Sequence, residues 1–98
     1  MYGNPQKRSA VEVQDLRREG GRWLKGLREA AGLSQRELAA GVGADYYTFI
    51  SQLETGRGRI PPDRYVDWAR AFGVPEKVFV REILRYYDPI TYGILFDE

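Results

Sequence analysis

Glycines and helix-capping residues divide this sequence into short helical segments, and that division constrains the fold more than any other feature. Apolar residues recur at helical spacing along the chain, and a glycine follows the run in several places, at Gly32, Gly56 and Gly73. Such a glycine tolerates the left-handed conformation that often ends a helix. No convincing strand pattern and no internal repeat is visible. The sequence therefore predicts an all-α fold.

The capping signals set the expected boundaries of the helices. The segments SAVE (9–12) and SQRE (34–37) are capping boxes, and Asp45 is a suitable N-cap for a third helix. We expect residues 9–88 to form one domain, between a flexible tail (1–8) and a short apolar C-terminal tail (89–98). Its helices are expected at residues 9–31, from 34 to the glycines at 41 and 43, and at 46–55, 63–72 and 76–87. The adjacent Gly20 and Gly21 predict a weak joint in the first helix, since each glycine costs about 1 kcal/mol relative to alanine.

Two residue types are missing, and their absence narrows the function. The chain has no cysteine and no histidine, which removes disulfides, thiolate ligands, the commonest general base and the commonest metal ligand. We therefore expect neither an enzyme nor a protein with a metal or other cofactor. No apolar run approaches membrane-spanning length and no signal peptide is visible. The expected location is the cytoplasm.

Charge is unevenly distributed along the chain. The net charge is only +1. Residues 1–59 nevertheless carry ten basic and seven acidic side chains, whereas residues 60–98 carry five and seven. Charge alone fits a set of solvated helix faces better than a nucleic-acid surface. What matters is whether the basic groups meet on one surface.

The segment 46–55 has two different faces at helical spacing. One stripe is apolar and contains Phe49, Ile50 and Leu53. The opposite stripe is uncharged but rich in hydrogen-bonding groups: Tyr47, Thr48, Ser51, Gln52 and Thr55. Exposed helix faces usually carry Glu, Lys and Arg, whereas Gln, Ser and Thr suit the edges of DNA bases. An ordinary polar helix face is the other interpretation of this stripe taken alone.

The neighbouring motifs favour the first interpretation. GLSQRELAAGVGA, followed by ISQLETGRGRIP, resembles the Cro/C1-type (XRE-like) helix-turn-helix family over roughly residues 21–84. The resemblance implies five short helices, of which the second and third form the helix-turn-helix, and the third enters the major groove of DNA. Between Gly43 and Ile50 the chain has one residue more than the family pattern. The complete expectation is a five-helix domain of this type with an N-terminal helical extension and the C-terminal tail.

The resemblance also implies roles for individual residues. Base reading is expected at Tyr47, Thr48, Ser51 and Gln52. Phosphate contacts are expected at Gln35, Arg36, Tyr46, Arg57 and Arg59. A structural ion pair between the first and third helices is expected at Arg28 and Glu54.

These observations predict a sequence-specific, double-stranded DNA-binding transcriptional regulator. An antitoxin of a toxin–antitoxin pair and a protein-interaction module are the alternatives. The apolar groups between residues 83 and 96 exceed what one small core requires. We expect them to join two copies into a homodimer, although the tail could instead fold over its own core or bind another protein. Asp88 and Pro89 favour a short sixth helix there, and the alternation of Ile90, Tyr92, Ile94 and Phe96 leaves an edge strand open.

Overall fold

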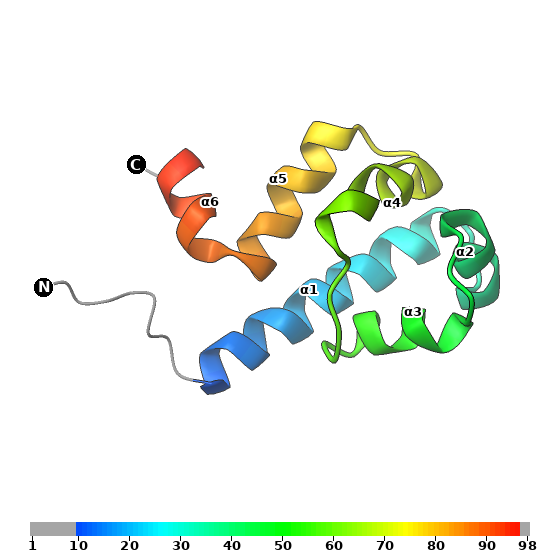
Figure 1. The fold of residues 1–98 in the computed structure, drawn as a ribbon, viewed down its shortest axis with the longest axis horizontal. Helices are drawn as coiled ribbons and strands as arrows, with labels where there is room; N and C mark the ends of the chain where they lie inside the picture. Colours follow the sequence, from blue (N-terminus) through cyan, green and yellow to red (C-terminus); the bar gives the residue numbers. More distant parts are fainter. Residues whose placement is uncertain (1–9, 97–98) are drawn as a thin grey trace, which may run out of the picture.

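The computed structural model of the protein describes residues 10–96, which form helices and no strand (Figure 1). The all-α prediction is confirmed. The expected flexible tail (1–8) and the first residue of the SAVE capping box, Ser9, lie outside the described residues. The elements are α1 (Ala10–Ala30), α2 (Gln35–Val42), α3 (Tyr47–Glu54), a 3-10 turn η1 (Pro62–Arg64), α4 (Tyr65–Phe72), α5 (Glu76–Tyr87) and α6 (Pro89–Phe96).

The long helix α1 is the central element of the fold. In Figure 1 it runs diagonally through the molecule, with α3 on one side and α5 on the other, and it contacts both. Helix α2 packs on α3 and α4, and α4 packs on α5. The core between these helices includes seven large side chains that are almost completely buried: Leu24, Leu38, Ile50, Leu53, Ile60, Phe79 and Ile83.

The two adjacent glycines of α1 are packing positions and not a joint. The helix is continuous from Ala10 to Ala30, so the expected weak point at Gly20 and Gly21 is wrong. A β-carbon on Gly21 would lie 2.4 Å from the backbone oxygen of Glu54, and one on Gly20 would lie 2.8 Å from Cβ of Tyr86. These glycines therefore let α3 and α5 approach α1 closely, and the packing offsets their poor helix propensity.

The ends of α2 follow the sequence signals. The Ser34 hydroxyl accepts from the Glu37 amide at 3.0 Å, and the Glu37 carboxylate accepts from the Ser34 amide at 2.8 Å. The second capping box is therefore confirmed. Gly43 ends the helix with a left-handed φ of 72°, the conformation that favours glycine at this position.

The start of α3 differs from the expectation. Tyr46, and not Asp45, occupies the N-cap, and its side chain makes no capping hydrogen bond. The helix begins at Tyr47, and Asp45 lies in the turn, one residue too early to cap it. The side chain at the cap is thus an aromatic ring that is 74% exposed.

Helix α4 also begins later than expected. The turn η1 occupies residues 62–64, and α4 starts at Tyr65. Four residues of the helix face the core: Tyr65, Trp68, Ala69 and Phe72. Val66, in contrast, is 38% exposed. The buried side chains follow a spacing of three and four residues, and Val66 lies about 100° around the helix from Tyr65.

The C-terminal tail forms the helix that the sequence favoured, with Pro89 as its first residue. The Asp88 carboxylate accepts from the Thr91 amide at 3.1 Å and from the Thr91 hydroxyl at 2.7 Å. These bonds hold the pKa of Asp88 below its ordinary value, as an N-terminal cap should. The edge-strand alternative is therefore excluded for residues 89–96.

The close approach of α1 and α3 generates a prediction about Gly21. We expect Gly21→Ala to destabilise the fold by about 1–3 kcal/mol, because its methyl group would overlap backbone atoms of α3 that cannot move independently. Urea denaturation monitored by circular dichroism measures this change.

Gly26→Ala is the matched control in the same helix. A β-carbon on Gly26 would meet nothing within 4 Å, so this substitution should stabilise the protein by about 0.5–1 kcal/mol. Equal effects of the two substitutions would contradict close packing at Gly21.

Candidate nucleic-acid interface

Helices α2 and α3 pack against each other and are joined by a tight turn that begins at Gly43. On α3, Ile50 and Leu53 are buried in the core, and Phe49 packs against it. The opposite side of the helix faces outward. The apolar and polar stripes of this segment therefore have the orientation that their spacing predicts.

The outward face of α3 carries the side chains that the sequence indicated for base reading. Tyr47, Thr48 and Gln52 are exposed, and Ser51 is half-buried. The Thr55 hydroxyl bonds back to the carbonyls of Ser51 and Gln52 at 3.0 and 3.2 Å. It caps the end of the helix, so its hydroxyl is less available than the side chains of Gln52 and Thr48.

A cation–aromatic contact connects the outer surfaces of the two helices. The guanidinium carbon of Arg36 on α2 lies 4.3 Å from the centre of the Tyr47 ring on α3. Contacts of this kind contribute about 0.5–1 kcal/mol at exposed sites. The contact places the positive charge of Arg36 directly beside the uncharged face of α3.

A buried cluster ties α1, α2 and α3 together beneath this surface. The guanidinium of Arg28 donates to both carboxylate oxygens of Glu54, at 2.6 and 3.2 Å, and to the carbonyl of Leu33 at 2.8 Å. The hydrogen bond to Glu54 is the main cause that raises the pKa of Arg28. Both side chains are largely buried, so each charge depends on the other for its stabilisation.

Gln35 belongs to the same cluster. Its side-chain amide donates to Glu54 at 3.1 Å, and this bond uses one of its two N–H groups. The backbone amides of Gln35 and Arg36 lie in the first turn of α2, where they have no intrahelical acceptor. These amides and the second side-chain N–H are the groups that can meet a phosphate here.

The two arginines of the loop after α3 lie in different environments. Arg57 is exposed, and its backbone amide donates to the carbonyl of Gln52 at 2.8 Å. Arg59 is also exposed, but its guanidinium carbon lies 4.9 Å from the centre of the Tyr87 ring on α5. Burial raises the pKa of this Tyr87 phenol, and the hydroxyl accepts from the Ile60 amide at 3.2 Å.

Two polar residues of α1 that the sequence analysis did not select lie at the same loop. Gln14 donates to the carbonyl of Gly56 at 3.2 Å, and Arg17 stands over the Tyr87 ring at 5.6 Å. A signal for them exists, since residues 14, 17, 21, 24 and 28 follow one another at helical spacing. Apolar periodicity does not mark Gln14 and Arg17, because both side chains are polar although they lie at inward positions.

This arrangement defines a class of protein: an all-helical domain that contains a helix-turn-helix. The second helix of the motif, α3, has an exposed face, and the buried Arg28–Glu54 ion pair supports it from the inner side. A family model described as a helix-turn-helix domain matches residues 20–79. The chain belongs to this family, which is part of the XRE/Cro-type helix-turn-helix group. Membership indicates DNA binding. A comparison with curated proteins found no match.

Two further observations concern the described residues, 10–96. None of their helices is both long enough and apolar enough to cross a membrane. They also contain no group of three or more side chains placed to hold a metal ion.

The buried cluster generates a prediction about stability. Glu54→Ala should cost about 3–5 kcal/mol, because it leaves the largely buried Arg28 without its counter-charge and Gln35 without its acceptor. Replacing Arg28 and Glu54 together should cost less than the two single changes added together. A double-mutant cycle by chemical denaturation measures the coupling.

Glu76→Ala is the surface control for this cycle. Its carboxylate is 3.8 Å from Arg70, and both side chains are largely exposed, so its removal should change stability by less than about 1 kcal/mol. Strict additivity between Arg28 and Glu54 would contradict a coupled pair.

Proposed function

We propose that the protein is a sequence-specific, double-stranded DNA-binding transcriptional regulator that inserts α3 into the major groove. The exposed face of α3 carries this proposal, because it offers hydrogen-bonding groups without charge. A major groove is wide enough for one helix and presents a distinct pattern of donors and acceptors for each base pair. An uncharged face of this kind can discriminate among bases instead of only attracting phosphates.

Positive charge at both ends of this face supports the proposal. Arg36 stands on the Tyr47 ring at the start of α3, and Arg57 is exposed just beyond its end. In this proposal the two arginines contact phosphates on either side of the groove and fix the register of α3. Tyr46 and the amides at the start of α2 would contact the same backbone near Arg36.

The proposal predicts a specific role for Gln52. Gln52→Ala should weaken binding to the preferred site by about 1–3 kcal/mol and relax the preference at one base pair, because glutamine can pair with adenine through two hydrogen bonds. Selection from random duplex DNA, followed by affinity measurements at one salt concentration, tests both effects.

Thr55→Ala provides the control on the same helix end. The Thr55 hydroxyl is bonded to backbone carbonyls of α3, so its loss should leave the selected DNA motif unchanged. The proposal fails if the wild-type protein selects no motif at all. The assignment of Gln52 fails if Gln52→Ala selects the wild-type motif with wild-type affinity.

We also propose that the regulator is a homodimer, because one α3 helix contacts only a few base pairs. Two copies on a two-fold symmetric site would place their recognition helices about 34 Å apart, in successive major grooves. The surface proposed for the contact is the apolar side of α5 and α6. Ile94 and Leu95 on α6 are 76% and 60% exposed, and no residue of α6 is fully buried.

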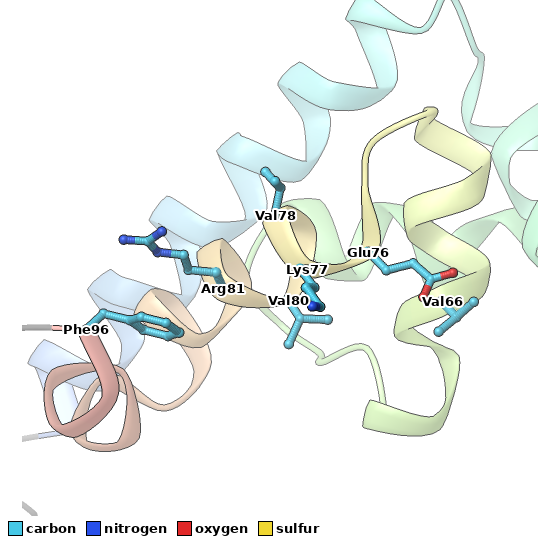
Figure 2. A pocket seen from close by; sticks show the side chains of 7 residues that line it. All are labelled: Val66, Glu76, Lys77, Val78, Val80, Arg81 and Phe96. Atoms are coloured by element: carbon cyan, nitrogen blue, oxygen red, sulfur yellow. The ribbon is translucent and has the colours of Figure 1, made fainter.

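A groove beside this surface supports the same choice. It is lined mainly by α5, with Val66 of α4 and Phe96 of α6 on either side (Figure 2). The earlier expectation for the interface included Ile83 and Tyr87, which are buried in the core of their own chain. The proposed contact therefore moves to Val78, Ile94 and Leu95.

The dimer proposal predicts that charge on α6 separates the two copies. The double substitution Ile94→Asp and Leu95→Asp should give a monomer, because burying two carboxylates against apolar groups is strongly unfavourable. Val11→Asp is the control, since the Val11 side chain on α1 is about as exposed as those of Ile94 and Leu95. Sedimentation at several protein concentrations measures the oligomeric state.

The sedimentation results distinguish a homodimer from a complex with a different protein. A monomeric wild-type protein at high concentration would contradict the homodimer. If that monomer still binds its DNA site, the apolar surface of α6 would instead favour a different protein partner, as an antitoxin or an interaction module requires. Loss of the dimer in Val11→Asp as well would place the interface elsewhere.

A further inference from the structure

The first half of α1 lies outside the matched family region and packs against the loop that follows α3. The family match begins at residue 20. Before that point, Gln14 bonds to the carbonyl of Gly56. Gly56 has a φ of 82°, and a β-carbon there would lie 2.9 Å from the backbone nitrogen of Arg18. Figure 1 shows the loop passing beside α1 at this point, so the extension is fixed to the end of α3.

Two arginines meet at this contact. The guanidinium carbons of Arg17 on α1 and Arg59 on the loop lie 5.6 and 4.9 Å from the centre of the same ring, that of Tyr87. Tyr87 is buried and its hydroxyl is bonded to the Ile60 amide. One fixed ring thus contacts two cations, one from the extension and one from the loop, and the two charges are close enough to affect each other. We call Arg17 and Arg59 the arginine clamp.

The charges of the clamp are not neutralised within residues 10–96. Five arginines of this region, Arg18, Arg28, Arg64, Arg70 and Arg85, pair with carboxylates. Arg17 and Arg59 form no ion pair there, and neither do Arg22, Arg36, Arg57 and Arg81. Asp88 is close enough for Arg59 to affect its pKa, but the two side chains form no ion pair. The clamp is therefore a pair of like charges without an ion-pair partner among the described residues, and Asp88 offsets only part of the charge of Arg59.

The environment of Arg17 adds a cost to this arrangement. Its Nε is buried and has no hydrogen-bond partner among the described residues. Burial, followed by the charge of Arg59, lowers the pKa of Arg17. Burying an unpaired polar group normally destabilises a fold, and a bound anion would relieve the repulsion between the two arginines.

We propose that Arg17 and Arg59 jointly bind one phosphate of the DNA backbone beside the end of α3. This inference rests on the proposed DNA-binding function and adds a residue from outside the family region. The clamp directly follows the recognition helix in space, where a strand bordering the major groove would pass. Guanidinium groups suit this ligand because their planar donors match phosphate oxygens.

The salt dependence of DNA binding tests the proposal. A non-specific duplex is titrated at several salt concentrations with the wild-type protein, Arg17→Gln, Arg59→Gln and the double variant. Each single change should weaken binding about tenfold and lower the salt slope by about one unit. Because both arginines hold the same phosphate, the double variant should also lose only about one unit. Arg70→Gln, which removes an exposed arginine of α4, should bind as the wild type does.

Thermal melting separates binding from a structural role. Without DNA, Arg17→Gln should melt at or above the wild-type temperature, because it removes an unbalanced charge. The duplex should raise the melting temperature of the wild type more than that of Arg17→Gln. Arg17→Lys keeps the charge without the planar donors, and it should retain the salt slope while binding more weakly than the wild type.

Several outcomes would overturn the clamp. The clamp is rejected if Arg17→Gln binds DNA with wild-type affinity and salt slope, or if it melts well below the wild type in the absence of DNA. A slope reduced by two units in the double variant would mean two separate phosphates. If the wild-type protein binds no duplex, the proposed function itself fails, whereas wild-type binding that is insensitive to Arg17 rejects the clamp alone.

Discussion

The close contact between α1 and α3 is the constraint on which the rest of the structure depends. Gly21 allows the backbone of α3 to touch α1, and the Arg28–Glu54 pair connects the same two helices at 2.6 Å. Backbone contact fixes the distance between the helices, and the two-point ion pair fixes their register. Because both charges are largely buried, neither partner can leave without stranding the other. Contacts with α1 therefore hold α3 firmly in position on its inner side.

This support determines what α3 can present to its surroundings. Glu54, Leu53 and Ile50 hold the inner side of the helix, so its uncharged polar side faces outward. The bond from Gln35 to Glu54 joins α2 to the same cluster, and Arg36 then reaches the Tyr47 ring on the outer surface. A rigid element with supported side chains is what a base-reading surface needs. The DNA-binding proposal thus depends on the Arg28–Glu54 pair, which is buried beneath the proposed DNA surface.

The sequence by itself determined the class of fold and the face of the third helix. Capping residues mark where α2 begins, and glycines mark where the first four helices end, because these signals act within a few residues of the chain. The spacing of Phe49, Ile50 and Leu53 gave the inner side of α3, and the motif order gave the family. The favoured short helix after Asp88 is also a local result, since Asp88 caps it through Thr91. The capping signal at Asp45 was misleading. The turn before α3 has one residue more than the family pattern, and Tyr46 is the N-cap.

Only the tertiary structure decided what the glycines of α1 do and which polar residues meet. In the sequence, Gly20 and Gly21 predict a weak helix, whereas in the fold they are contact points for α5 and α3. Arg17, Arg59 and Tyr87 are far apart in the chain and carry no shared motif, yet both arginines contact the Tyr87 ring. Periodicity shows which side of a helix is inward, but it does not show which partner will cover that side. That choice depends on how the helices pack, because contacts between distant residues arise only when the whole core is assembled.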